Sequence, residues 1–207
     1  MGKSKIKICG ITNADDAVKA SLYGAWAVGF IFYQKSPRYI SPSRARKIIQ
    51  QLPPFITPVG VFVNQNERAV KDICRFTHID TVQLHGDESP EYCRRFKDYK
   101  IIKAFRVGDD FEFGKIQNYK VDAYLFDSYQ KDAYGGTGEP FDWKFLSYNK
   151  IDKPYILAGG LNVENVAKAL EILTPYAVDV SSGIEKSPGV KDPRQMKAFI
   201  DMVNFQK

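Results

Sequence analysis

The stretch YILAGGLNVENVAKALEILTP, residues 155–175, contains the unit on which the fold prediction rests. An apolar run at 155–158 leads into Gly159 and Gly160, and Asn162 then precedes a helical pattern of apolar residues that stops at Pro175. A short continuous apolar run bounded by glycine is typical of a strand buried on both faces. Asn is favoured at helix starts, and Pro cannot continue a helix. The stretch therefore predicts a strand, a tight turn and an amphipathic helix.

The same order of apolar run, turn and helix continues along the whole chain. The apolar runs lie at residues 6–9, 27–32, 57–63, 79–85, 101–105, 121–127, 155–158 and 177–181. Several helical patterns between them open with Ser-Pro or Asp-Pro, where the missing N–H of proline needs no partner. The first helix has Thr12 as its candidate N-cap, and the weakest helical patterns cover 111–119 and 143–148.

Strands that alternate with helices predict parallel β/α units, and two arrangements compete for them. One is a closed (β/α)8 barrel and the other is an open doubly wound sheet. The dinucleotide signature G-x-G-x-x-G is absent after the first run, where Cys9, Gly10, Ile11 and Thr12 stand. Eight units also match the barrel. We therefore predict a single α/β domain over residues 1–207, a (β/α)8 TIM barrel.

The composition excludes several protein classes. The chain has 3 Cys without a C-x-x-C pair, which argues against a disulfide scaffold or a cysteine-rich zinc module and suits a reducing compartment. Its 2 His are too few for a histidine-rich metal site. No apolar run approaches the roughly 18 residues of a membrane span, and the first residues lack the apolar core of a signal peptide. We expect a cytoplasmic protein.

The net charge of +6, from 30 Lys and Arg against 24 Asp and Glu, raises the question of nucleic-acid binding. The basic residues occur in runs of two at most and alternate with acidic ones. Solvated helix faces explain such a pattern, so no nucleic-acid partner is expected.

Glycines and polar residues gather where the predicted strands end, which is where barrels carry their active sites. Glycine lets backbone N–H groups approach an anion, and a helix N-terminus adds partial positive charge. Gly159 and Gly160, followed one unit later by Ser182 and Gly183, therefore predict a phosphate site, although Gly159 and Gly160 alone could simply form a tight turn. The segments at the strand ends are KICGIT (7–12), GFIFYQKSPRYI (29–40), VGVFVNQ (59–65), VQLHGDE (82–88), Asp127 with YGGTGEPFDW (134–143), LAGGLN (157–162), VDVSSGIE (178–185) and PGVKD (188–192).

Taken in order, these segments resemble the phosphoribosylanthranilate isomerases, over essentially the whole chain from Lys5 to the last helix. The resemblance implies an Amadori rearrangement of N-(5-phosphoribosyl)anthranilate to 1-(2-carboxyphenylamino)-1-deoxyribulose 5-phosphate, the third step of tryptophan synthesis from chorismate. It implies a small phosphorylated aminosugar as substrate, no cofactor and no metal, and a monomer or homodimer. It also implies Cys9 as general base, Asp127 as general acid and Arg38 as the ligand of the anthranilate carboxylate, a planar group that suits a guanidinium.

The residues add predictions about the barrel mouth. Strands one and six lie three positions apart in a ring of eight, so Cys9 and Asp127 can face each other. Lys7 and Asp179 belong to neighbouring strands, and a buried Lys needs a carboxylate partner. We therefore expect a Lys7–Asp179 ion pair, which Lys103 could join, with Asp179 in the substrate pocket.

The surroundings of these groups can also be predicted. An Asp that serves as an acid near pH 7 needs desolvation, which an apolar wall of Phe126, Tyr129 or Trp143 under the loop 135–138 would supply. His85 is expected to line the pocket without taking part in proton transfer. The remaining cysteines, 74 and 93, fall on apolar helix faces and are expected to be inert core residues.

Two other functions remain open at this stage. A different barrel enzyme on a sugar phosphate would share the phosphate loops. An indole-glycerol-phosphate synthase should show a Lys and Glu pair at strand ends, and a pentulose-phosphate epimerase two acidic residues and metal-binding His. A non-catalytic phosphate- or nucleic-acid-binding protein would bind polyanions with steep salt dependence, and would give Cys9 and Asp127 no reason to face each other.

Overall fold

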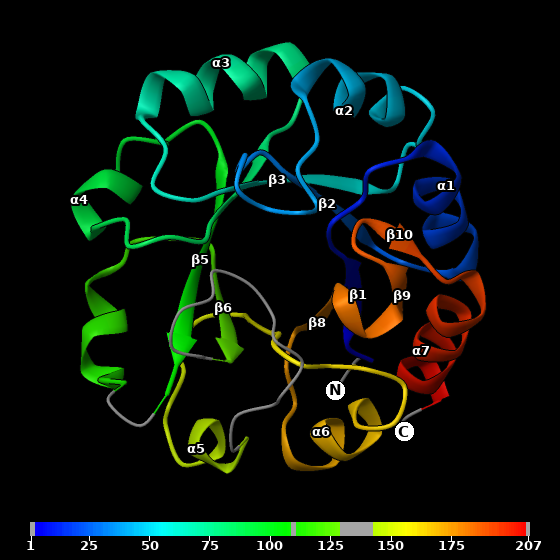
Figure 1. Ribbon diagram of the computed structural model, residues 1–207. Helices are drawn as coiled ribbons and strands as arrows, with labels where there is room; N and C mark the ends of the chain where they lie inside the picture. Colours follow the sequence, from blue (N-terminus) through cyan, green and yellow to red (C-terminus); the bar gives the residue numbers. More distant parts are fainter. Residues whose placement is uncertain (1–2, 109–110, 129–142, 206–207) are drawn as a thin grey trace.

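The computed structural model describes residues 3–108, 111–128 and 143–205. Within these ranges, parallel strands β1 to β8 follow one another around a closed barrel, and β8 pairs with β1 to complete the ring. The helices lie around the outside of the strands, with α2 and α3 at the top of Figure 1 and α7 at its right. The predicted (β/α)8 barrel is confirmed.

The barrel strands are β1 (Lys5–Ile8), β2 (Ala27–Ile31), β3 (Thr57–Phe62), β4 (Thr81–Leu84), β5 (Lys100–Val107), β6 (Ala123–Ser128), β7 (Tyr155–Leu157) and β8 (Ala177–Val180). The α-helices are α1 (Ala14–Tyr23), α2 (Pro42–Ile49), α3 (Glu67–Thr77), α4 (Pro90–Cys93), α5 (Lys144–Ser147), α6 (Val166–Ile172) and α7 (Pro193–Phe205). Two 3₁₀ helices, η1 (Phe113–Asn118) and η2 (Ser182–Ile184), and an antiparallel pair, β9 (Glu185–Ser187) with β10 (Val190–Lys191), complete the elements.

The structure differs from the expected elements in local detail. The weak pattern at 111–119 forms the 3₁₀ helix η1, and the pattern at 143–148 contains only one turn, α5. The N-cap of α1 is Asn13, whose side chain accepts the backbone N–H of Asp16, whereas Thr12 donates to the Gly189 carbonyl. The two-residue strand β10 is too short to show a period in sequence, so sequence reasoning missed the β9–β10 pair.

The core has two parts, one between the sheet and the helices and a smaller one inside the barrel. The inner cluster consists of Val59, Ile102, Ala104, Leu125, Ile156, Ala158 and Ala177. Buried polar side chains that also come from the strands are Lys7, Gln83, Lys103, Asp127 and Asp179. The barrel interior therefore combines apolar packing with a polar region, and such groups stay buried only when they are paired.

The two remaining cysteines belong to the outer core. Burial raises the pKa of Cys74 to about 12 and that of Cys93 to about 11, so both are neutral thiols at pH 7. They match the prediction of inert packing residues.

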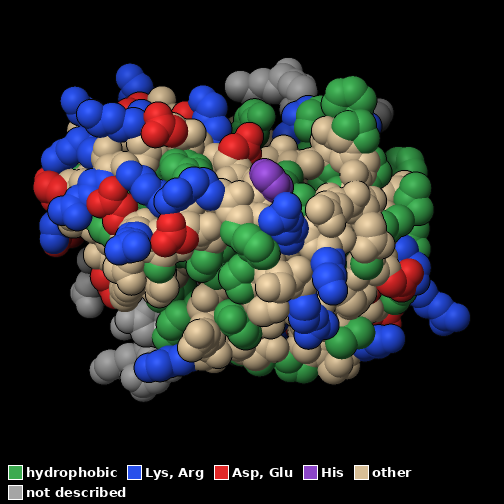
Figure 2. Space-filling model, turned by 90° about the horizontal axis from the view of Figure 1, so that it is seen from above, with side chains coloured by type: hydrophobic (Ala, Val, Ile, Leu, Met, Phe, Trp, Pro, Cys, Tyr) green, Lys and Arg blue, Asp and Glu red, His purple; other side chains and the backbone are tan. Residues whose placement is uncertain are grey.

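The surface agrees with the interpretation of the charge pattern. Figure 2 looks onto the side of the molecule that α2 and α3 cover and shows basic and acidic side chains interspersed there. Among the described residues, no helix combines the length and apolar character needed to cross a membrane.

Candidate active site

A pocket opens where the barrel strands end, and most of the predicted site residues line it. They come from the ends of six different strands or from the loops that follow them, so only the closed barrel brings them together. The predicted residues in the lining are Cys9, Arg38, His85, Asp127, Gly159, Gly160, Asp179 and Ser182. Apolar lining comes from Ile31, Val61, Val63, Ala158, Leu161 and Val180, with Tyr33, Ser36 and Ser181 beside them.

Gly183 does not line the pocket, unlike the other predicted site residues. A Cβ added to Gly183 would lie 2.0 Å from the carbonyl oxygen of Leu161. Only glycine therefore allows the loops after β7 and β8 to pack this closely. Gly159 and Gly160 have φ angles of 81° and 68°, a left-handed conformation that favours glycine. These two loops form the wall where we predicted the phosphate site.

The Cys9 thiol lies at the end of β1 and is 6% exposed. A Cβ on Gly29 would be 2.8 Å from Sγ, so the glycine on β2 leaves room for the sulfur. Burial raises the pKa of the Cys9 thiol, while the positive charges of Lys7 and Lys191 oppose the increase. The resting protein therefore holds Cys9 mainly as a thiol.

Lys7 and Asp179 form the predicted ion pair. The Lys7 amine donates to Asp179 Oδ2 at 2.8 Å, and the two residues are register partners on β1 and β8. Burial disfavours the ammonium, but the charge and hydrogen bond of Asp179, together with the neighbouring Cys9, outweigh burial and raise the pKa of Lys7. Asp179 Oδ1 has no hydrogen-bond partner among the described residues and is buried beside the pocket.

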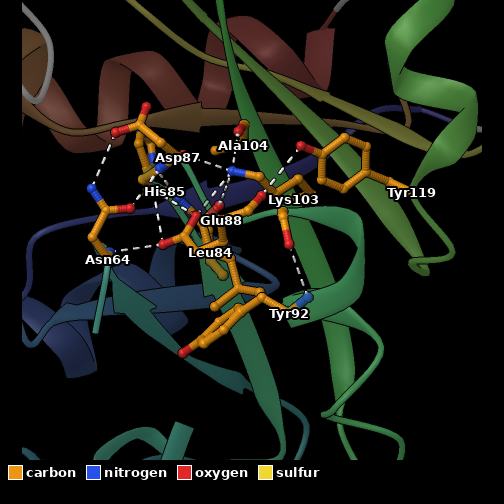
Figure 3. A network of polar contacts seen from close by, with 12 residues as sticks. Asn64, Leu84, His85, Asp87, Glu88, Tyr92, Lys103, Ala104 and Tyr119 are labelled. Carbon is orange, nitrogen blue, oxygen red and sulfur yellow. Dashed lines mark hydrogen bonds and ion pairs between the residues drawn. The ribbon is translucent and has the colours of Figure 1, made fainter. Parts of the chain in front are cut away.

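Lys103 does not join this pair, contrary to our expectation. Its amine lies 3.0 Å from Glu88 Oε2 and also donates to the carbonyl oxygens of Gly86 and Ala104, at 2.7 and 2.9 Å. Figure 3 shows Lys103 at the centre of this network, with Glu88 beside it. Lys103 stands on β5, on the other side of the ring from β1, so a nearer carboxylate on the loop after β4 satisfies it.

Asp127 contacts His85 across the mouth of the barrel. His85 Nε2 lies 3.0 Å from Asp127 Oδ2, and the other ring nitrogen, Nδ1, lies 2.7 Å from Nε2 of Gln83. Sequence reasoning placed His85 in the pocket but missed its contacts with Asp127 and Gln83. The alternation of Gln83 and His85, which puts both side chains on one face of a strand, was the available signal.

The structure does not place Phe126 or Trp143 in the predicted apolar wall around Asp127. Phe126 precedes Asp127 on β6 and therefore points to the opposite face, where its ring packs against Phe113 and Tyr155 outside the barrel. Trp143 is buried in the same outer cluster. Tyr129 and the loop 135–138 lie outside the described residues.

Arg38 lines the pocket with its guanidinium already held on one side. Nε and Nη2 both donate to the Glu185 carboxylate, at 3.0 and 2.8 Å, and Lys191 contacts the same carboxylate at 2.8 Å. Burial opposes the charge on Glu185, but Arg38 and Lys191 hold its pKa below the usual range. Glu185 and Lys191 lie in two of the strand-end segments named above, but no role was predicted for either from the sequence. Together the three side chains carry a net charge of +1 beside the pocket.

The described residues contain no group of three or more His, Cys, Asp or Glu placed to hold a metal ion. The lining side chains that can exchange a proton are Cys9, His85 and Asp127, and Arg38 among them can bind an anion.

Comparison with known proteins identifies the family of the chain. Residues 6–202 match the family model for N-(5'-phosphoribosyl)anthranilate isomerase. The curated N-(5'-phosphoribosyl)anthranilate isomerase of Geotalea uraniireducens is 50% identical over 200 residues, covering 95% of this chain and 97% of the relative.

Two solved structures of related phosphoribosyl anthranilate isomerases are similar to this barrel. A phosphoribosyl anthranilate isomerase in complex with reduced 1-(o-carboxyphenylamino)-1-deoxyribulose 5-phosphate is 42% identical, with a TM-score of 0.88 over 97% of this chain and 98% of that chain. The second, described as mutually generated monomers of the dimeric enzyme from Thermotoga maritima, is 40% identical, with a TM-score of 0.87 and the same coverage. The chain belongs to the N-(5'-phosphoribosyl)anthranilate isomerase family and is an isomerase of tryptophan biosynthesis.

Proposed function

We propose that Asp127 is the general acid and Cys9 the general base of the Amadori rearrangement. The observation that supports this assignment is that a carboxyl group from β6 and a thiol from β1 line one pocket. Asp127 gives a proton to the ring oxygen of the aminosugar, and the ring opens to a protonated Schiff base. Cys9 then takes the proton from C2', which yields the enolamine that rearranges to the aminoketose.

The electrostatics of the site fit this order of steps. A thiolate is the useful base, and burial alone disfavours it. The Lys7 ammonium already favours the thiolate, and the ring-opened Schiff base adds a second positive charge next to the sulfur. The thiolate therefore forms when the intermediate that needs a base is present.

The substrate's two anionic ends have separate binding regions in this proposal. The phosphate binds at the loops after β7 and β8, where Gly159, Gly160 and Ser182 line the pocket. The anthranilate carboxylate binds the Arg38 guanidinium, which Glu185 holds in place through Nε and Nη2. Asp179, on β8, contacts the polar sugar through Oδ1, which has no hydrogen-bond partner among the described residues.

The decisive experiment is the loss of fluorescence of freshly made phosphoribosylanthranilate with two variants. Cys9→Ala and Asp127→Asn should each lose about 10²–10⁴ in kcat, the usual contribution of one acid or base group, while their circular dichroism stays that of the folded protein. Cys74→Ala, which alters a thiol remote from the pocket, should keep its turnover. Wild-type turnover in folded Asp127→Asn would show that the acid has been misassigned.

We further propose that the chain forms a homodimer through the face opposite the pocket. Large apolar side chains are exposed there: Trp26 directly precedes β2, Phe55 lies two residues before β3, and Tyr176 directly precedes β8. Phe55 is 93% exposed, and apolar side chains exposed together on one face mark protein–protein contacts. The related enzyme from Thermotoga maritima is described as dimeric. Light scattering should give twice the chain mass for the wild type and the single chain mass for Phe55→Glu.

We also propose that residues 1–207 act as one catalytic domain in the cytoplasm. The described barrel uses elements from both ends of the sequence, and all three cysteines are free thiols, which suits a reducing compartment.

A further inference from the structure

Gln83, His85 and Asp127 form a line of hydrogen-bonding groups across the mouth of the barrel. The amide nitrogen of Gln83 lies 2.7 Å from His85 Nδ1, and His85 Nε2 lies 3.0 Å from Asp127 Oδ2. Gln83 is fully buried in the barrel, on β4, two residues before His85. A buried amide this close to a ring nitrogen restricts the hydrogen positions of the imidazole.

The direction of each hydrogen bond follows from the chemistry of the groups. An amide N–H can only donate, so Nδ1 must accept and carry no hydrogen; the single hydrogen of a neutral imidazole then sits on Nε2. Turning the Gln83 amide over would leave its NH₂ without a partner among the described residues. In the observed orientation only Oε1 lacks one, and an unsatisfied carbonyl oxygen is the more common case in protein interiors.

We propose that Gln83 is a positioning residue that fixes His85 as the neutral tautomer with its hydrogen on Nε2. His85 then donates to Asp127 Oδ2 and leaves Oδ1 to carry the catalytic proton. The statement about Oδ1 rests on the proposed role of Asp127 as the acid. The acidic groups that act on His85 are Asp127 on β6 and Asp179 on β8.

The fixed tautomer would help the acid in a specific way. When Asp127 gives its proton from Oδ1 to the ring oxygen of the substrate, a carboxylate remains in a buried site. The Nε2–H of His85 already donates to Oδ2 and stabilises that carboxylate, and nothing has to rearrange. The other tautomer would place the lone pair of Nε2 against Oδ2 and would repel the charge.

Nuclear magnetic resonance of the imidazole nitrogens tests the tautomer in the unmodified protein. The chain has only 2 His, and His78→Asn assigns the signals, because His78 has a left-handed conformation that Asn tolerates. We expect His85 at pH 7 to show a hydrogen on Nε2 and none on Nδ1. A hydrogen on Nδ1, alone or together with one on Nε2, would overturn the proposal without any variant.

Two substitutions at Gln83 test its effect on catalysis. Gln83→Met removes the donor at similar volume, so His85 should show a mixture of tautomers. We expect kcat to fall by about 10–100-fold, by analogy with the loss of partners that orient metal-bound His. KM should stay within about twofold, because Gln83 is absent from the pocket lining. Gln83→Glu offers an acceptor in place of the donor and should put a hydrogen on Nδ1. Unchanged nitrogen spectra in folded Gln83→Met would contradict the proposal.

The two proposals fail in different ways. If Asp127→Asn keeps its turnover, the acid assignment is wrong, although the tautomer of His85 can still be as inferred. If Asp127→Asn is inactive and His85 carries its hydrogen on Nδ1, the acid assignment stands and the role of Gln83 is wrong.

Discussion

Two buried ion pairs of the barrel, Lys103 with Glu88 and Lys7 with Asp179, have similar chemistry and very different surroundings. The Lys103 amine donates to Glu88 and to backbone carbonyls, and the Glu88 carboxylate also accepts the backbone N–H groups of Asn64 and Gly86 (Figure 3). Asp179 Oδ1, by contrast, lacks a partner in the described ranges. The pair with complete hydrogen bonding ties the loops after β3 and β4 to β5, whereas the incomplete pair lies next to the pocket and the Cys9 thiol.

The completeness of hydrogen bonding distinguishes a buried ion pair that only holds the structure together from one that is available to a ligand. A buried charge that lacks part of its hydrogen bonding costs free energy, and a protein keeps that cost where a ligand can supply the missing contact. Burial alone would not have separated the pairs, because all four side chains are below 10% exposure.

The largest effect should come from breaking the complete pair. Lys103→Met leaves the Glu88 carboxylate buried without its cation and should lower the free energy of unfolding by about 3–5 kcal/mol, measured by urea denaturation. The double variant Lys103→Met with Glu88→Gln should recover part of this loss, because it removes the uncompensated charge. If the single variant is as stable as the wild type, the pair does not hold the loops.

A smaller effect, on reactivity, should come from breaking the incomplete pair. Lys7 lowers the pKa of the Cys9 thiol, so Lys7→Met should raise that pKa and leave less thiolate at a given pH. Because iodoacetamide reacts with the thiolate, we expect alkylation of Cys9 near pH 8 to be slower in Lys7→Met than in the wild type. Mass spectrometry can follow the buried Cys74 and Cys93 in the same sample as references. An unchanged rate would mean that Lys7 serves only to balance Asp179.

The ion pairs of Glu185 with Arg38 and Lys191, at the edge of the pocket, should affect the stability of the protein at acidic pH. The pKa of Glu185 is held below the usual range by Arg38 and Lys191, against burial. A carboxyl group with a lowered pKa adds stability above its unfolded value, and this stability is lost as the pH falls through the folded value. Wild-type stability should therefore fall between about pH 5 and pH 3 more steeply than that of Glu185→Gln, measured by urea unfolding across this range. Parallel pH curves would assign the acid loss to other carboxylates.

The smallest effect should come from a pair on the surface, which serves as a control for the others. Lys19 lies 2.6 Å from Asp15 on α1, but the Asp15 side chain is 70% exposed. Solvent already satisfies both charges, so Lys19→Met should leave the free energy of unfolding unchanged within the error of urea denaturation. A loss as large as that in Lys103→Met would mean that the Met substitution itself is responsible.

The barrel and most of its pocket could be predicted from sequence for a simple reason. Continuous apolar runs and turn residues repeat along the chain, and the end of each strand in a barrel points to the same face. Cys9, Arg38 and Asp127 follow from that rule plus the resemblance to a family. The prediction that Lys7 pairs with Asp179 follows from the closed ring, in which the first and last strands are neighbours.

The predictions that failed depended on contacts between distant elements. The partner of Lys103 is decided by which carboxylate the loop after β4 brings near, and no local pattern contains that information. Phe126 was misplaced because its neighbour Asp127 was considered without the alternation along β6. Glu185 was missed as the partner of Arg38 because 147 residues separate them in sequence.

The seam at which β8 meets β1 has a consequence for how the enzyme gains activity during folding. Lys7 and Asp179 are 172 residues apart in sequence, and Cys9 follows on the same first strand. Contacts over such a distance must overcome a large loop-closure entropy, so they slow folding and tend to form late. Recovered turnover during refolding would therefore report the closing of the ring, whereas far-ultraviolet circular dichroism would report the helices that form before it.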